Sequence, residues 1–263
     1  MIFETHAHYD DEAFEQDRDS LLSGMKEHGI GTIVNIAADL ESCKTTLALS
    51  EKYSFVYAAL GVHPSGTEEM TDKSLRWMAG LCRDHSVKKG GKVVAVGEIG
   101  LDYHWEEPGR EIQREWFERQ LEMAREISLP VVIHSRDAAK DTCDIMKKHC
   151  AGEMGGILHC YSYSRELAKD FLDMGFSFGI GGVVTFNNAR KLKETVEYLP
   201  LEKIVLETDS PYLAPVPFRG KRNSSLNLMY VAEEIGRIKH IETDKVIEIT
   251  EQNALKLFHL EGD

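Results

Sequence analysis

The feature that most constrains the fold of this sequence is a regular alternation of short apolar runs with longer amphipathic runs. The apolar runs are rich in Val, Ile and Phe and are too short for free-standing helices, so we predict strands there. The predicted strands are residues 1–5, 31–36, 55–60, 93–98, 131–134, 156–159, 176–180 and 204–207. The intervening runs have helical spacing, and several begin with Asp, Thr or Ser, which suit a helix N-cap. Helices are predicted at residues 11–28, 40–52, 71–85, 110–128, 136–149, 164–174 and 189–198, followed by 224–240 and 243–259.

Alternating strands and helices predict a parallel sheet that is covered by helices. Eight such units in 263 residues match a closed (β/α)8 TIM barrel, and we predict one domain over residues 1–263. The main alternative is a doubly wound open sheet, which usually has a glycine-rich loop after its first strand. The sequence His-Ala-His-Tyr-Asp at residues 6–10 occupies that place, and the glycine-rich residues 179–182 come late, so the barrel is favoured.

Composition and charge exclude some classes of protein. A formal net charge of -13 argues against a protein that coats long nucleic acid with a basic surface, but it permits an enzyme that binds a strand end. No run approaches the roughly 18 apolar residues of a membrane span. The first residues do not resemble a secretory signal. Five cysteines without a CxxC pair fit reduced thiols, so we expect a cytoplasmic protein that does not bind membranes.

Residues that can bind metal fall at the ends of predicted strands, where barrel enzymes place their active sites. His6 and His8 end the first strand, and residues two apart on a strand project to the same face. Glu98 ends the fourth strand, where burial of an unpaired carboxylate would be costly. The corresponding positions of the fifth, sixth and eighth strands hold His134, His159 and Asp209.

Each of these residues is weak evidence alone, because an HxH pair arises easily by chance and a single histidine is more often a hydrogen-bonded core residue. Together the six supply nitrogen and oxygen ligands for Zn, Mn or Mg. Six ligands are more than one open catalytic site needs. We therefore predict two divalent cations bridged by a carboxylate, an arrangement that activates water and stabilises a developing oxyanion.

Seven short motifs occur in order along the chain. They are Thr5-His6-Ala7-His8, Gly61-Val62-His63-Pro64, Gly97-Glu98-Ile99-Gly100-Leu101-Asp102-Tyr103, His134-Ser135-Arg136, His159-Cys160-Tyr161-Ser162, Glu207-Thr208-Asp209-Ser210-Pro211-Tyr212 and Arg219-Gly220-Lys221-Arg222-Asn223. Together they resemble the signatures of the TatD family, metal-dependent deoxyribonucleases within the amidohydrolase-like barrels. The resemblance extends from residue 2 to about residue 258.

The resemblance implies a role for each predicted ligand. One cation would be held by His6, His8 and Asp209, and Glu98 would bridge to a second cation held by His134 and His159. Asp209 and Glu98 would then be the catalytic residues. Asp209 lies where a proton acceptor for the attacking water is expected.

Four further residues are candidates for binding substrate. His63 resembles the family's contact to a substrate phosphate, although a turn histidine before Pro64 is about equally compatible with the sequence. Arg219, Lys221 and Arg222 place three cations within four residues shortly after Asp209. Beside metal ligands in an acidic protein, such a loop suggests a phosphate-binding site. A solvated charged loop is the alternative.

Five other residues have weaker predictions. Glu4 shares a strand face with His6 and His8, and Glu207 shares one with Asp209, so both could orient ligand imidazoles. Hydrogen-bonded carboxylates of the barrel are the alternative. Tyr103, His104 and Trp105 follow the Glu98 strand and could stack on a base. For Trp105, packing against the rim of the barrel is favoured.

The leading functional hypothesis is a metal-dependent deoxyribonuclease, an exonuclease that cleaves phosphodiester bonds of DNA with metal-activated water. We expect a monomer that acts on single-stranded DNA or a strand end. One alternative keeps the metal site but hydrolyses an ester or amide, such as an aminoacyl ester on tRNA, because fold does not determine function. A weaker alternative is a non-catalytic scaffold stabilised by metal. The large ligand set argues against it, since structural zinc sites are usually closed by four ligands.

Overall fold

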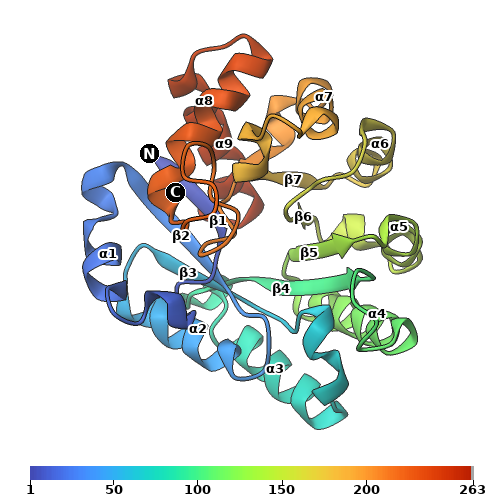
Figure 1. The fold of residues 1–263 in the computed structure, drawn as a ribbon. Coiled ribbons are helices and arrows are strands. Elements are labelled where there is room, and N and C mark those ends of the chain that lie inside the picture. Colours follow the sequence, from blue (N-terminus) through green and yellow to red (C-terminus); the bar gives the residue numbers. More distant parts are fainter. Residues whose placement is uncertain (262–263) are drawn as a thin grey trace.

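A computed structural model describes residues 1–261 and consists of eight parallel strands surrounded by helices (Figure 1). The strands are β1 (Ile2–Ala7), β2 (Ile30–Ile36), β3 (Val56–Leu60), β4 (Val93–Asp102), β5 (Val131–Arg136), β6 (Gly156–Leu158), β7 (Ser177–Ile180) and β8 (Ile204–Leu206). Their order in the sheet follows their order in the sequence, and every neighbouring pair is parallel. The predicted (β/α)8 barrel is therefore confirmed.

The barrel closes through hydrogen bonds between the end of β1, with the residue after it, and the segment that follows β8. The Asp209 N–H donates to the His6 carbonyl at 2.9 Å, and the His8 N–H donates to the Ser210 carbonyl at 2.8 Å. Ala7 and Ser210 form a parallel bridge at the same point. Because the segments that close the barrel also contain candidate metal ligands, closure places Asp209 against His6 and His8.

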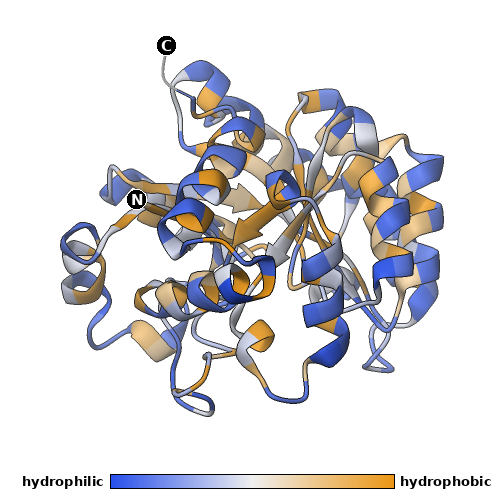
Figure 2. Cartoon of the chain, turned by 90° about the horizontal axis from the view of Figure 1, so that it is seen from above, coloured by the Kyte–Doolittle hydropathy of each residue, from blue (hydrophilic) through white to orange (hydrophobic). Residues whose placement is uncertain are grey.

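The helices form the outer layer of the barrel. They are α1 (Arg18–Gly24), α2 (Ser42–Lys52), α3 (Asp72–Asp84), α4 (Arg110–Ile127), α5 (Ala139–Lys148), α6 (Arg165–Asp173), α7 (Arg190–Tyr198), α8 (Leu228–Lys239) and α9 (Thr243–Leu257). Seen from above in Figure 2, apolar colour concentrates in the central strands, and the surrounding helices carry both polar and apolar colour. None of the helices in residues 1–261 is long and apolar enough to cross a membrane. The strands are buried on both faces, as β4 shows along its whole length, which is typical of parallel sheets.

The predicted continuous helix over residues 11–28 is wrong. The segment divides into a 3-10 turn (Glu12–Phe14), α1 and a second 3-10 turn (Lys26–His28). Tertiary hydrogen bonds explain the interruption, because the Ala13 carbonyl accepts from Arg222 and Arg18 donates to the carbonyls of residues 9, 10 and 11. The helical spacing of the sequence could not reveal these distant partners.

Strands β4 and β5 extend further than predicted, so Glu98 and His134 lie within strands rather than at their ends. The two strands stay paired as far as Asp102 and Arg136, and their register shifts between Val96 and Ile99. Such irregularities re-aim side chains, and this one surrounds Glu98. Gly97 is required here because a Cβ atom at this position would lie 2.6 Å from the Cβ of Val132.

Candidate metal centre

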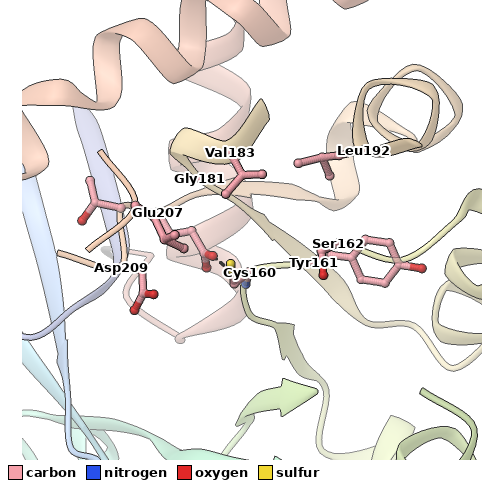
Figure 3. Close-up of a pocket in the computed structure, with 10 residues that line it drawn as sticks. Cys160, Tyr161, Ser162, Gly181, Val183, Leu192, Glu207 and Asp209 are labelled. Atoms are coloured by element: carbon pink, nitrogen blue, oxygen red, sulfur yellow. Dashed lines mark hydrogen bonds between the residues drawn. The ribbon is translucent and has the colours of Figure 1, made fainter. Parts of the chain in front are cut away.

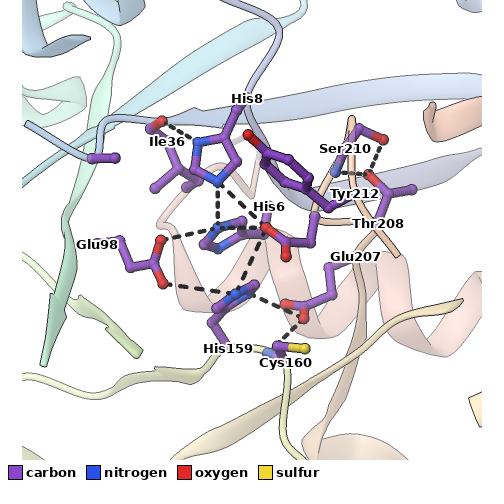
Figure 4. Close-up of polar contacts among 12 residues, drawn as sticks. His6, His8, Ile36, Glu98, His159, Cys160, Glu207, Thr208, Ser210 and Tyr212 are labelled. Carbon is purple, nitrogen blue, oxygen red and sulfur yellow. Dashed lines mark hydrogen bonds and ion pairs between the residues drawn. The ribbon is translucent and has the colours of Figure 1, made fainter. Parts of the chain in front are cut away.

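The predicted ligands meet on the carboxyl-terminal side of the barrel. Figure 4 shows His6, His8, Glu98 and His159 pointing toward one another from β1, β4 and the end of β6. His6, Glu98 and His159 are buried, and groups of their ligand atoms lie within 4.8 Å of one another. The structure therefore brings together residues that are more than 150 positions apart in the sequence.

One group of ligand atoms consists of His6, His8 and Asp209. The Nε2 atoms of His6 and His8 are 3.2 Å apart, and Asp209 Oδ1 lies 3.4 Å from His8 Nε2 and 3.7 Å from His6 Nε2. The Nδ1 of His8 donates to the Ile36 carbonyl at 2.8 Å, so a neutral His8 presents a lone pair at Nε2. Nitrogen and oxygen lone pairs converge there, and this donor set fits a divalent cation.

Glu98 lies beside this group and also contacts His134 and His159. Its Oε2 is 3.5 Å from His6 Nε2, while its Oε1 is 2.7 Å from His134 Nδ1 and 3.7 Å from His159 Nε2. Burial alone would raise the pKa of Glu98, but the surrounding imidazoles hold it well below its usual value. An ionised carboxylate whose two oxygens face different imidazoles would be able to bridge two cations.

Asp102 belongs to this centre and was missed by the sequence analysis. Its Oδ2 lies 3.1 Å from His134 Nε2, opposite the Glu98 carboxylate that His134 Nδ1 contacts. Asp102 is 4% exposed, and Gln113 on α4 bonds its backbone N–H and carbonyl. Residues 98 and 102 share strand parity, so the alternation used for Glu4 and Glu207 could have identified Asp102.

Glu207 and Glu4 support the centre in different ways. Glu207 Oε1 is 3.1 Å from His159 Nδ1 and accepts the Cys160 N–H at 2.6 Å, so it lies where it can orient the His159 ring. Glu4 instead accepts the backbone N–H groups of His6 and Thr208, at 3.0 and 2.9 Å. Burial raises the pKa of Glu4 to about 8. The predicted contact of Glu4 with an imidazole is wrong, because Glu4 holds the backbone of the ligand segments.

A small cavity lies behind Asp209. It has a volume of about 20 Å³, room for one water molecule, and is lined by Cys160, Glu207, Asp209 and mainly apolar neighbours (Figure 3). Cys160 is half-buried, and loss of hydration together with the nearby carboxylates of Asp209, Glu207 and Glu98 raises the pKa of its thiol well above the usual value. Cys160 is therefore a neutral packing residue on the inner side of the centre.

An open pocket of about 1210 Å³ lies over the ligands, and His63 and Arg136 are among the residues that line it. Arg219, Lys221 and Arg222, predicted to bind substrate, are not among its lining residues. Both Nη atoms of Arg222 bond Asp17, at 2.7 and 2.6 Å, and the Arg219 guanidinium lies over the Phe186 ring. The structure thus places Arg136, rather than this loop, beside the metal ligands.

His63 lies in the pocket wall, where its ring contacts that of His134 edge-on at 4.4 Å between centroids. Its Nδ1 accepts the Ser65 N–H at 3.2 Å, so the proton of the neutral ring is on Nε2. Burial lowers the pKa of His63 to about 4, which keeps the ring neutral at pH 7. His63 is therefore a capping residue of the following turn and also presents an N–H donor.

We expect cation binding to the metal-free protein at pH 7.5 to release at least one proton. Burial alone would lower the pKa values of His8 and His159, but nearby carboxylates raise them to about 9 and about 10. Both rings are then protonated in the metal-free protein, and a ligating nitrogen must lose its proton. The affinity for the cation should rise with pH until the pH exceeds the pKa values of His8 and His159.

Calorimetric titration of Mn or Zn in buffers of different ionisation enthalpy measures the proton release. A binding enthalpy that is the same in all buffers would contradict this assignment of ligands.

Comparison with known proteins agrees with this centre. The family model described as TatD related DNase matches residues 3–259. The uncharacterized metal-dependent hydrolase YabD of Bacillus subtilis is 40% identical over 99% of this chain and 100% of its own length. YcfH of Escherichia coli, also an uncharacterized metal-dependent hydrolase, is 34% identical over 100% of this chain and 97% of its own.

Solved structures show the same barrel. The crystal structure of YjjV, a TatD homologue from Escherichia coli, superposes with a TM-score of 0.90 at 32% identity and covers 98% of both chains. A TatD family hydrolase from Entamoeba histolytica gives a TM-score of 0.87 at 23% identity over 98% of this chain and 97% of its own. With its histidine and carboxylate ligand groups, this chain belongs to the TatD family of metal-dependent hydrolases.

Proposed function

We propose that this protein is a deoxyribonuclease that uses two divalent cations to cleave phosphodiester bonds at the end of a DNA strand. The observation that carries the proposal is the position of Glu98, whose Oε2 faces His6 while its Oε1 faces His134 and His159. Paired cations at such a bridge lower the pKa of water and stabilise both the attacking and the leaving oxygen of an in-line displacement. Mg, Mn and Zn all accept these ligands.

Residues around the centre fit the steps of phosphodiester hydrolysis. Asp209 lies at the open side of the centre, where it can accept the proton of the attacking water. His63 Nε2–H and the Arg136 guanidinium line the same pocket and can donate to the non-bridging phosphate oxygens. Within residues 1–261, Arg136 has no ion pair with a protein carboxylate, which leaves its charge available to an anion.

Arg136→Ala should raise KM for a phosphodiester about tenfold or more, since a hydrogen bond to a charged group contributes about 1.5–3 kcal/mol. Lys221→Ala is a matched control, because it removes a cation that does not line the pocket. Steady-state kinetics on methyl p-nitrophenyl phosphate measures both variants. If Lys221→Ala had the larger effect, the loop at residues 219–222 would be the phosphate-binding site after all.

Release of nucleotides from end-labelled single-stranded DNA tests the proposal directly. Chelator-stripped protein is supplied with Mg, Mn or Zn, and turnover of DNA is compared with that of simple phosphodiesters and a panel of carboxylic esters. Metal-restored DNA cleavage is the expected result. Turnover of esters alone would retain the metal centre and replace the nuclease with an ester hydrolase.

A further inference from the structure

Two exposed aromatic side chains stand at the rim of the pocket. Trp105 is 60% exposed and Tyr212 is 55% exposed, more than the other exposed aromatic residues, Trp77 and Tyr198. Both line the pocket over the metal ligands, whereas Trp77 and Tyr198 do not. Trp105 therefore lies at the rim, as predicted, but more than half of its surface stays exposed to the pocket and solvent.

The two side chains come from opposite sides of the barrel. Trp105 follows β4 and Tyr212 follows β8, and three strands lie between these elements in either direction around the barrel. The metal ligands line the same pocket between them, on the carboxyl-terminal side of the barrel. A substrate whose phosphate is at the centre can therefore contact one ring on each side.

Each side chain has a contact that restricts it. The Trp105 ring packs edge-on with His104 at 4.8 Å between centroids. The Tyr212 hydroxyl donates to Asp11 at 3.0 Å, and its backbone N–H donates to the Asp209 carbonyl at 2.8 Å. Because each ring has a contact at one edge and keeps much of its surface exposed, we expect it to lose less conformational entropy on stacking than an unrestrained side chain would.

The charge of the rim argues against binding along a phosphate backbone. Outside the metal ligands, the pocket has one cationic side chain, Arg136, among the residues that line it. Five carboxylates line the same rim: Asp10, Asp11, Glu12, Asp39 and Glu41. Such a rim repels phosphates everywhere except at the cations and Arg136. Affinity beyond that of the phosphate at the cations must then come from the base rather than from neighbouring phosphates.

We propose that Trp105 and Tyr212 are base-stacking platforms, so that the site takes a nucleotide or the end of a single strand through its bases rather than its backbone. The inference rests on the proposed function, because it takes the substrate to be a nucleotide. Stacking accepts any base, since every base has a π-face. The site should therefore bind strand ends with little sequence preference.

Equilibrium binding to the metal-loaded protein tests this. Dissociation constants for thymidine 5′-monophosphate and methyl phosphate are measured by calorimetry, and their ratio isolates the contribution of the nucleoside. Wild-type protein should bind the nucleotide at least about fivefold more tightly, the lower end of what stacking of one base contributes. Trp105→Ala and Tyr212→Ala should each reduce this ratio and leave methyl phosphate binding unchanged.

Two controls separate stacking from structural effects. Trp77→Ala removes an exposed tryptophan outside the pocket and should leave the ratio unchanged. Tyr212→Phe removes the hydrogen bond to Asp11 but keeps the ring. This variant should therefore keep most of the preference for the nucleotide over methyl phosphate. Equal binding of the two ligands by wild-type protein, or equal weakening of both ligands in the alanine variants, would overturn the proposal.

Hydrolysis of methyl p-nitrophenyl phosphate by wild-type protein reports separately on the proposed function. If this ester is not cleaved while the binding ratio behaves as expected, the phosphodiesterase assignment fails and base stacking stands. If it is cleaved but the ratio is near one, the phosphodiesterase stands and base stacking fails.

Discussion

Glu98→Gln should lower metal-dependent turnover by about 10³-fold or more, because paired cations contribute several kcal/mol of transition-state stabilisation and each 1.36 kcal/mol is a factor of ten. The substitution keeps the size of the side chain but removes the negative charge that lies among His6, His134 and His159. The centre would then lose the carboxylate that contacts His6 through one oxygen and His134 and His159 through the other.

The number of bound cations, measured by native mass spectrometry, should fall together with turnover. Glu233→Gln is a matched control, because Glu233 is an exposed glutamate on α8, away from the pocket. A Glu98→Gln variant that kept full metal content and near wild-type turnover would contradict the bridging role. If turnover were lost while the variant still bound the full number of cations, Glu98 would act in catalysis but would not be needed to hold the cations.

Asp209→Asn should reduce kcat by about 10²- to 10⁴-fold, the range for removal of a general base. The amide keeps an oxygen near His8 Nε2, which the Asp209 carboxylate approaches to 3.4 Å, but it cannot accept the proton of an attacking water. KM should change much less than kcat, because the phosphate contacts of Arg136 and His63 remain.

Asp84→Asn is the matched control, since Asp84 is an exposed aspartate at the end of α3. The folded state is checked by thermal unfolding of each variant with and without added metal. An equal rise in KM and fall in kcat, or unchanged kcat, would show that Asp209 does not act as the base. Cation content near that of wild type would show that the loss is catalytic rather than a failure to bind metal.

Local patterns in the sequence were enough to predict the fold and most of the centre. The period of apolar residues indicates strands and helices, and eight parallel strands in this length leave few arrangements other than a barrel. Parity along a strand placed His6 and His8 on one face, and their Nε2 atoms are 3.2 Å apart. It also placed Glu207 toward the centre, where it contacts His159.

Other features depended on contacts between distant residues. The interruption of the helix at residues 11–28 depends on Arg222, and the same contact with Asp17 directs Arg222 away from the pocket. Exposure of Trp105 depends on how the loop after β4 lies over the barrel mouth. None of these contacts leaves a periodic signal in the local sequence.

The sequence by itself therefore determined which residue types stand at the ends of the barrel strands, because strand and helix periods are local properties of the chain. Only the tertiary structure decided which of these residues contact one another. Closure of the barrel places Asp209 against His6 and His8, and the extended pairing of β4 with β5 places Asp102 against His134. Those relations depend on register and closure, which are set only when the whole sheet forms.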